Sequence, residues 1–169
     1  MPEQNFNEFP ESPQRYSWTD SSLEGLSKEE LYYRIYHDEI TGYYNWNYLW
    51  ARLQHDIHSS DPKYCFVHFD IKGTKILNST YGHEGVNELL RSVCNQLEKE
   101  KENGWVLHAC RCDNDNFSMM IKVMEQKEIQ ERLKKMFDAI SFFPSDPTCR
   151  IYYRCGVVTA EDAIENDDR

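Results

Sequence analysis

The apolar run from Cys65 to Phe69 constrains the fold of this chain more than any other feature. His68 is its one polar residue, and Asp61-Pro62 and Lys72-Gly73 bound it on either side. A short run of residues that favour strands, bounded by such breakers, predicts a central strand buried on both faces. Asp70 then lies at the carboxyl end of that strand.

The loop after Asp70 carries the residue types of a binding site. Gly73 lets the backbone approach a ligand closely, and Lys72 and Lys75 supply positive charge. A helix is expected to begin near His83. Together the strand end, the acid, the loop and the lysines suggest a site for a metal ion and phosphate. The alternative is an ordinary surface acid that ends a strand.

Composition narrows the class of protein. A length of 169 residues fits one domain with an extension. The net charge of -10 argues against a nucleic-acid or membrane surface, since such surfaces need clustered Lys and Arg. No segment is apolar for long enough to insert in a membrane, and the first residues lack the pattern of a signal peptide. We therefore expect a cytoplasmic protein.

The positions of the cysteines also agree with a cytoplasmic protein. They lie within apolar helix or strand patterns, so we expect reduced thiols in the core, with disulfides as the weaker alternative. They are Cys65, Cys94, Cys110, Cys112, Cys149 and Cys155.

The first part of the chain is predicted to hold a leader and two helices. Residues 1–26 carry three prolines, many small polar residues and an acidic excess, which indicate a flexible leader. Ser27 and Glu30 form a capping box, so a helix is expected over residues 27–37. Apolar residues then recur every three or four positions over residues 45–59, which predicts an amphipathic helix.

The rest of the chain alternates between helical and strand patterns. Two β-rich runs flank Asp113-Asn114, and these residue types tolerate the left-handed backbone of a two-residue turn, so we predict a hairpin. The other expected elements are helices over residues 83–101 and 129–140 and strands over residues 105–112, 117–123 and 150–160. Such an order predicts the α+β class, with a mainly antiparallel sheet flanked by helices.

The stretch from Asp70 to Asn87 resembles the first strand and loop of the diguanylate cyclase (GGDEF) family, D-x-D-x-F-K-x-x-N-D-x-x-G-H-x-x-G-D. The matching residues are Asp70, Lys75, Asn78, Gly82 and His83. The departures are Lys72 for the second acid, Thr74 for the aromatic residue and Asn87 for the last acid.

Two further segments are similar to motifs of this family. DEITGYYNWNYL resembles D-x-L-T-G-L-x-N-R-x-x-L, which in the family joins a signalling helix to the catalytic domain. Its matches are Asp38, Thr41, Gly42, Asn45 and Leu49. The resemblance thus implies a signalling-type helix over residues 27–37 and a GGDEF-like domain over residues 38–169. An ordinary helix-to-helix turn is the alternative.

The predicted hairpin stands where the family has R-x-G-G-D-E-F. Arg111, Asp115 and Phe117 match, whereas both glycines and the glutamate are absent, so residues 113–117 read DNDNF. The resemblance implies a nucleotidyl-cyclase-like fold. It also implies that the family's last helix and strand, with a lysine and an arginine that clamp phosphates, are missing from this chain.

The resemblance implies a set of site residues as well. The family condenses two GTP molecules into cyclic di-GMP with divalent ions. By position, the metal ligands are Asp70 and Asp115, the catalytic residues are Lys75, Asp115 and Asn116, and the nucleotide-binding residues are Gly73, Asn78, Asn87 and Asn114. Two acids that meet at a turn by chance are the alternative reading of the metal pair.

The departures favour a degenerate domain without cyclase activity. Asn114 brings a side chain where backbone passes the phosphates, and Asn116 and Asn87 each replace a carboxylate. We therefore expect a regulatory or interaction module, with GTP as a possible ligand, Mg²⁺ or Mn²⁺ only with bound nucleotide, and a protein partner or homodimer. The alternatives are a working diguanylate cyclase and a scaffold without ligand.

Overall fold

The structure, a computed structural model, describes residues 25–57 and 64–159. In chain order the elements are α1 (Lys28–Tyr36), α2 (Trp46–Ile57), β1 (Tyr64–Ile71), α3 (Thr74–Glu102), β2 (Val106–Asp113), β3 (Asn116–Lys122), α4 (Gln126–Ala139), β4 (Phe142–Phe143), β5 (Asp146–Arg150) and β6 (Tyr153–Thr159). The predicted leader lies outside the described residues, apart from its last two positions. So does the end of the predicted helix over residues 45–59.

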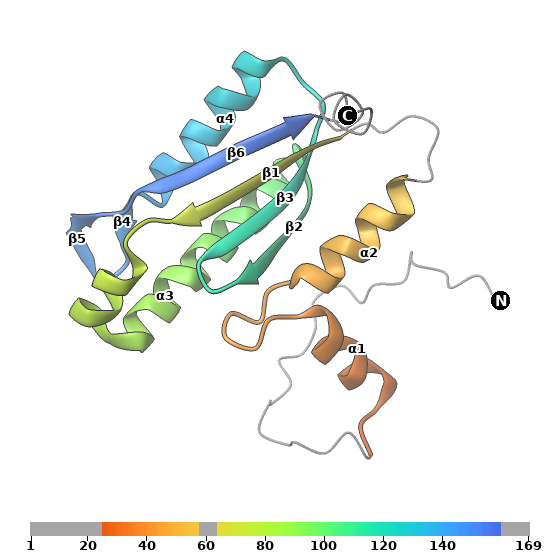
Figure 1. Ribbon diagram of the computed structural model, residues 1–169, viewed down its shortest axis with the longest axis horizontal. Coiled ribbons are helices and arrows are strands. Elements are labelled where there is room, and N and C mark those ends of the chain that lie inside the picture. Colours follow the sequence, from red (N-terminus) through yellow and green to blue (C-terminus); the bar gives the residue numbers. More distant parts are fainter. Residues whose placement is uncertain (1–24, 58–63, 160–169) are drawn as a thin grey trace, which may run out of the picture.

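The sheet has the strand order β2-β3-β1-β6, and each neighbouring pair is antiparallel. Helices α3 and α4 both cover one face of it, α2 packs on the opposite face over β2 and β3 through Leu49, and α1 packs on α2 (Figure 1). The predicted α+β class is confirmed. Ser27 and Glu30 form the expected capping box at the start of α1, with reciprocal hydrogen bonds of 2.8 and 3.1 Å.

The core lies between the sheet and its two helices. Alternate residues of β1 point into it, as the two-residue period of a strand requires. The residues of β1 in this core are Cys65, Val67, Phe69 and Ile71. On the opposite face His68 is exposed and Phe66 is half-buried. The prediction of a strand buried on both faces is therefore wrong, because on the opposite face α2 packs mainly over β2 and β3 and leaves His68 exposed.

Helix α3 begins at Thr74, nine residues before the predicted start at His83. Gly82 interrupts it with φ 71° and ψ 174°, a backbone conformation that is essentially restricted to glycine. The arm before Gly82 buries Leu77, whereas Ile76 is exposed. It therefore lacks the apolar stripe that reveals a helix in a sequence.

The hairpin of β2 and β3 is confirmed, but its turn lies one residue later than predicted. Asp113 pairs with Asn116, so the turn residues are Asn114 and Asp115. Asn114 has φ 43°, in the left-handed region that asparagine tolerates better than most residues. A second hairpin, β4–β5, was not predicted. It packs through Phe143, whose ring stacks on Tyr81 at 4.0 Å between centroids.

The cysteine prediction holds in part. All six cysteines are free. Three are buried and two are half-buried, but Cys155 is exposed because β6 is an edge strand of the sheet. Expecting every thiol in the core is therefore wrong for Cys155.

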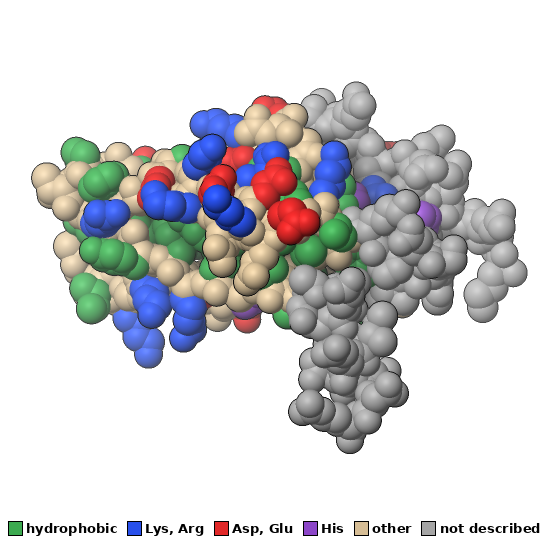
Figure 2. Space-filling view, turned by 90° about the horizontal axis from the view of Figure 1, so that it is seen from above, with side chains coloured by type: hydrophobic (Ala, Val, Ile, Leu, Met, Phe, Trp, Pro, Cys, Tyr) green, Lys and Arg blue, Asp and Glu red, His purple; other side chains and the backbone are tan. Residues whose placement is uncertain are grey.

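The outer surface over α4 carries charges of both signs in alternation, with hydrophobic side chains gathered at the end where β4 and β5 lie (Figure 2). Two ion pairs on α4 account for part of this alternation, Arg132 with Glu128 and Lys134 with Asp138. Within the described residues, no helix combines the length and the apolar character needed to span a membrane.

Candidate functional site

A cavity of about 550 Å³ opens between α3 and the hairpin turn. Five of the residues predicted for the site line it, namely Lys75, Asn78, Asn87, Asn114 and Asp115. Gly73, Asp70 and Asn116 are not among its lining residues. The sequence resemblance thus selected residues from three separate segments that the fold brings together around one space.

The break in α3 shapes this cavity. Lys75 and Asn78 belong to the arm before Gly82, and Val86, Asn87 and Leu90 belong to the arm after it. The second arm therefore supplies an apolar wall beside an amide. Its residues recur at three and four positions, so they share one face of the helix.

Asn78 offers an unused acceptor at this site. Its Oδ1 atom is buried, and no described residue donates a hydrogen bond to it. A buried polar atom without a partner costs about 1 to 3 kcal/mol, so such an atom calls for an explanation. A bound ligand with an N–H or O–H donor would supply one.

Asn87 is tied to its neighbours on α3. Its Nδ2 atom donates to Glu84 Oε2 at 3.4 Å, and Arg91 donates to Glu84 Oε1 at 2.8 Å. These hydrogen bonds from Arg91 and Asn87 lower the pKa of Glu84. The amide nitrogen of Asn87 is thereby oriented toward an acid that the sequence analysis did not consider.

Asp115 is held by the first residue of α3. Thr74 Oγ1 donates to Asp115 Oδ2 at 2.6 Å, and the backbone N–H of Ile71 donates to the Asp115 carbonyl at 3.2 Å. The hairpin turn is thus docked onto the loop that follows β1. Thr74 stands where the family has an aromatic residue, and no sequence signal pointed to this contact.

Asp70 has a different partner. Both of its carboxylate oxygens accept hydrogen bonds from Arg154 of β6, at 3.1 and 2.7 Å. In the sheet Asp70 pairs with Asn116, so Asp70 and Asp115 stand at adjacent strand ends while their carboxylates engage different groups. The Arg154 contact was missed, because it depends on how β6 aligns with β1.

In the described part of the chain, the side chain of Asn116 makes no hydrogen bond to Lys75. Its Nδ2 atom instead donates to Asp113 Oδ1 at 2.9 Å, across the base of the turn. Both residues replace members of the family motif, and together they brace the hairpin. The amide at position 116 therefore has a structural partner in place of a catalytic one.

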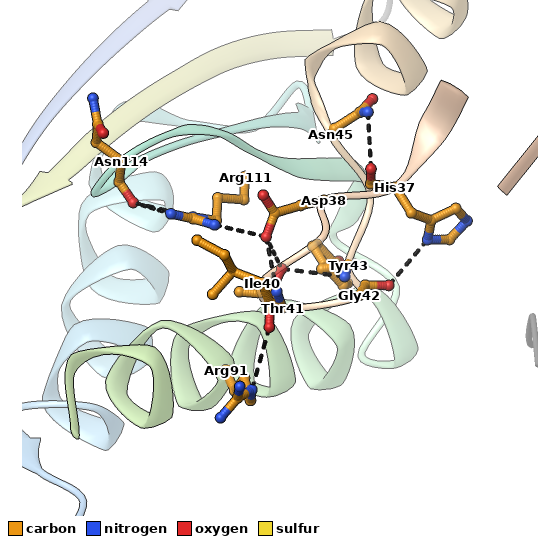
Figure 3. Close-up of polar contacts among 10 residues, drawn as sticks. All are labelled: His37, Asp38, Ile40, Thr41, Gly42, Tyr43, Asn45, Arg91, Arg111 and Asn114. Atoms are coloured by element: carbon orange, nitrogen blue, oxygen red, sulfur yellow. Dashed lines mark hydrogen bonds and ion pairs between the residues drawn. The ribbon is translucent and has the colours of Figure 1, made fainter. Parts of the chain in front are cut away.

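Arg111 connects the hairpin to the turn that follows α1 (Figure 3). It donates to Asp38 Oδ1 at 2.6 Å and, through Nε and Nη2, to the carbonyl of Asn114 at 3.0 and 2.6 Å. Asp38 Oδ1 also accepts from the N–H and hydroxyl of Thr41, at 2.8 and 2.7 Å. One buried guanidinium thus links two motifs 73 positions apart.

The same turn holds the end of α1. Asn45 Nδ2 donates to the carbonyls of Ile35 and His37, at 2.9 and 3.1 Å. The N–H of Arg111 donates to the Tyr44 carbonyl at 2.9 Å. Helix α1, the turn and the hairpin are therefore joined by consecutive hydrogen bonds, and Figure 3 draws the one from Asn45 to the His37 carbonyl.

The residues that could hold a metal ion are few. No group of three or more His, Cys, Asp or Glu side chains is arranged for metal binding in the described part of the chain. Mg²⁺ usually binds through one or two carboxylates together with substrate phosphates. Asp70 and Asp115 remain the predicted pair of carboxylates, and in this structure they accept hydrogen bonds from Arg154 and Thr74.

Comparisons with known proteins agree on one family. The family described as "Diguanylate cyclase, GGDEF domain" matches residues 35–167. No curated protein matches the chain.

Solved structures give the same fold. A diguanylate cyclase/phosphodiesterase from Caldicellulosiruptor saccharolyticus is 21% identical, with a TM-score of 0.67 over 82% of this chain and 84% of that one. The coiled coil and GGDEF domain of DgcB from Caulobacter crescentus, in complex with c-di-GMP, is 17% identical, with a TM-score of 0.65 over 76% and 71%. Diguanylate cyclase SiaD from Pseudomonas aeruginosa, in complex with its activator SiaC, is 18% identical, with a TM-score of 0.61 over 82% and 57%. With the family match over residues 35–167 and the fold in agreement, the chain belongs to the GGDEF family.

Proposed function

We propose that this GGDEF domain is a cytoplasmic regulatory or interaction module of cyclic di-GMP signalling that binds a guanine nucleotide without condensing it. The observation that carries the proposal is the cavity, which Asn78, with its buried and unpartnered acceptor, lines together with Lys75 and Asn87. The N–H groups of a purine can donate to that acceptor, and Lys75 can pair with phosphate. The free thiols agree with a reducing compartment.

Three contacts argue against turnover. Asn114 places a side chain at the turn where the family motif has glycine. Asn116 lacks a carboxylate and pairs with Asp113. Asp70 is neutralised by Arg154. Condensation requires a hydroxyl to lose its proton and attack a phosphate in line, and with Asn116 an amide stands where the family motif has a carboxylate that could assist it.

A divalent ion would accompany the nucleotide rather than reside in the apo domain. Asp70 and Asp115 would hold Mg²⁺ or Mn²⁺ once phosphate oxygens are present, which requires Asp70 to exchange Arg154 for the ion. The ion would neutralise phosphate charge. This chain's own residues then position the base through Asn78 and the phosphates through Lys75.

Calorimetric titration tests the proposal. Purified protein is titrated with GTP in the presence and absence of Mg²⁺, with ATP for comparison. We expect GTP to bind, and Asn78→Ala to weaken it about tenfold, which corresponds to one lost hydrogen bond. Asn95→Ala is the matched control, because Asn95 is an exposed asparagine on the same helix that does not line the cavity. Equal affinities in the two variants would contradict the assigned role of Asn78.

A working cyclase is the second candidate, favoured by one observation. The hydrogen bond from the Ile71 N–H to the Asp115 carbonyl keeps the two acids Asp70 and Asp115 at adjacent strand ends. Incubation with GTP and Mg²⁺ or Mn²⁺, followed by chromatography, decides the matter. Cyclic di-GMP that forms in the wild type and disappears in Asp115→Ala would overturn the proposal.

A protein partner or a homodimer belongs to the proposal too. SiaD, one of the proteins with this fold, was solved in complex with its activator SiaC. If no nucleotide gives heat in the titration, nucleotide binding is wrong for this chain. The function would then be that of a scaffold that binds another protein.

A further inference from the structure

A second cavity, of about 370 Å³, lies on the face of the sheet turned away from α3 and α4. It is lined by Trp46, Phe66, His68, Cys112, Asp113 and Ser118. The ring of Trp46 meets that of Phe66 edge-on, at 6.3 Å between centroids, and forms an apolar wall. This site is separate from the nucleotide cavity, because the sheet stands between the two.

Three polar side chains in this cavity form one hydrogen-bonded chain. The thiol of Cys112 donates to Ser118 Oγ at 3.1 Å, and Ser118 Oγ lies 2.8 Å from Nδ1 of His68. Ser118 is fully buried, Cys112 is half-buried and His68 is exposed. The buried hydroxyl of Ser118 therefore fixes the position of the Cys112 thiol in the cavity wall.

A second thiol lies behind the first. Cys110 Sγ is 3.7 Å from Cys112 Sγ and is fully buried. Burial raises the pKa of Cys110, whereas the hydrogen bonds that Cys112 shares with Cys110 and Ser118 lower the pKa of Cys112. Of the two, Cys112 is thus the more acidic thiol, and it is the one that lines the cavity.

We propose that Cys112 is a thiol–disulfide exchange site for low-molecular-weight disulfides. The Cys112 thiol gives up its proton to solvent, and the resulting thiolate attacks one sulfur of the disulfide. The disulfide's S–S bond breaks as a bond forms between its attacked sulfur and Cys112. The other half leaves as a thiolate and is protonated, so that Cys112 is oxidised while the leaving half is reduced.

The position of Cys112 links this site to the hairpin. Cys112 and Cys110 flank Arg111, whose side chain points to the other face and holds Asp38 and the Asn114 carbonyl. A group attached to Cys112 therefore sits on the same strand, one residue from the guanidinium that braces the nucleotide cavity.

The site can be identified on the wild-type chain without any variant. The reduced protein is treated with less than one equivalent of dithiobis(nitrobenzoate) or of oxidised glutathione, and the modified cysteine is located by peptide mass spectrometry. We expect Cys112 to be modified first. Cys155 is the internal comparison. The residue as a whole is exposed, but partial burial of its sulfur raises the pKa of the thiol to about 11. First modification at any other cysteine would overturn the proposal.

Variants then test the assignment. The fast phase of nitrothiobenzoate release should vanish in Cys112→Ser and persist in Cys155→Ser. A fast phase that persists in Cys112→Ser would refute the role of Cys112. Circular dichroism of each variant checks that the fold is retained.

Discussion

Replacing Arg111 with methionine should destabilise the domain strongly, because the guanidinium is the buried centre of the contact between hairpin and turn. Its side chain is 4% exposed and that of its partner Asp38 is 18% exposed. The substitution removes three charge-assisted hydrogen bonds and leaves the Asp38 carboxylate without its cation. We expect the free energy of unfolding to fall by about 3 to 4 kcal/mol, at the lower end of the range for a broken buried ion pair.

The expected loss of unfolding free energy lies at the lower end of that range because Asp38 keeps two other hydrogen-bond donors. The N–H and hydroxyl of Thr41 still bind Asp38 Oδ1 in the variant. A loss of this size should lower the midpoint of urea unfolding by about 1 to 3 M, as followed by tryptophan fluorescence. Asp38→Leu combined with Arg111→Met should cost less than the sum of the two single variants, since each single variant strands a charge.

Arg132→Met on α4 is the matched control. Arg132 pairs with Glu128 one turn away, and their side chains are 39% and 47% exposed. Such a surface pair is worth about 0.3 to 0.5 kcal/mol. If Arg111→Met costs no more than Arg132→Met, the view that this guanidinium holds the hairpin to the turn is refuted.

Substitutions at three further positions test the fold and its dependence on pH. Burial lowers the pKa of His37 below 6.5, so the unfolded chain binds the proton more tightly and stability falls as the pH drops below 6.5. Between about pH 7 and pH 5, the midpoint of urea unfolding should therefore decline less in His37→Phe than in the wild type. Equal declines in the two proteins would contradict this role of His37. Hydrogen bonds from Thr148 and Tyr81 lower the pKa of Asp146 to about 2, so its contribution to stability is present above pH 3.8 and lost as the pH falls toward 2. An NMR titration should find this pKa higher in Tyr81→Phe, and no rise would exclude the Tyr81 hydrogen bond as a cause. Because Asn114 has a positive φ, Asn114→Ala should lower the free energy of unfolding by about 1 kcal/mol, whereas Asn114→Gly should leave it nearly unchanged. Equal urea midpoints for the two variants would argue against backbone strain at this turn.

Local patterns in the sequence predicted much of this fold. The capping box at Ser27 and the apolar runs around the hairpin act over a few residues, so the sequence contains the whole signal. The arm of α3 before Gly82 was missed because a helix with one buried residue leaves no periodic stripe. The turn was misplaced by one residue because Asp113, Asn114 and Asp115 all suit a turn.

The candidate site, like the fold, could be predicted from the sequence only in part. Similarity to the family motifs selected Asn78, Asn87 and Asp115, and the fold gathers them around one cavity. The partners of these residues could not be predicted. Thr74 reaches Asp115 across 41 positions and Arg154 reaches Asp70 across 84, and such contacts depend on the register of distant strands. No local pattern encodes that register.

Gly82 has a consequence for how this cavity can change. A Cβ atom at this position would meet no atom within 4 Å, so its constraint is the backbone angle alone. That angle sets how far the arm carrying Asn78 splays from the arm carrying Asn87. The backbone conformation of Gly82, which does not line the cavity, therefore sets the width of the ligand space. Evolution can adapt this cavity to a bulkier or smaller ligand without replacing any residue that touches the ligand.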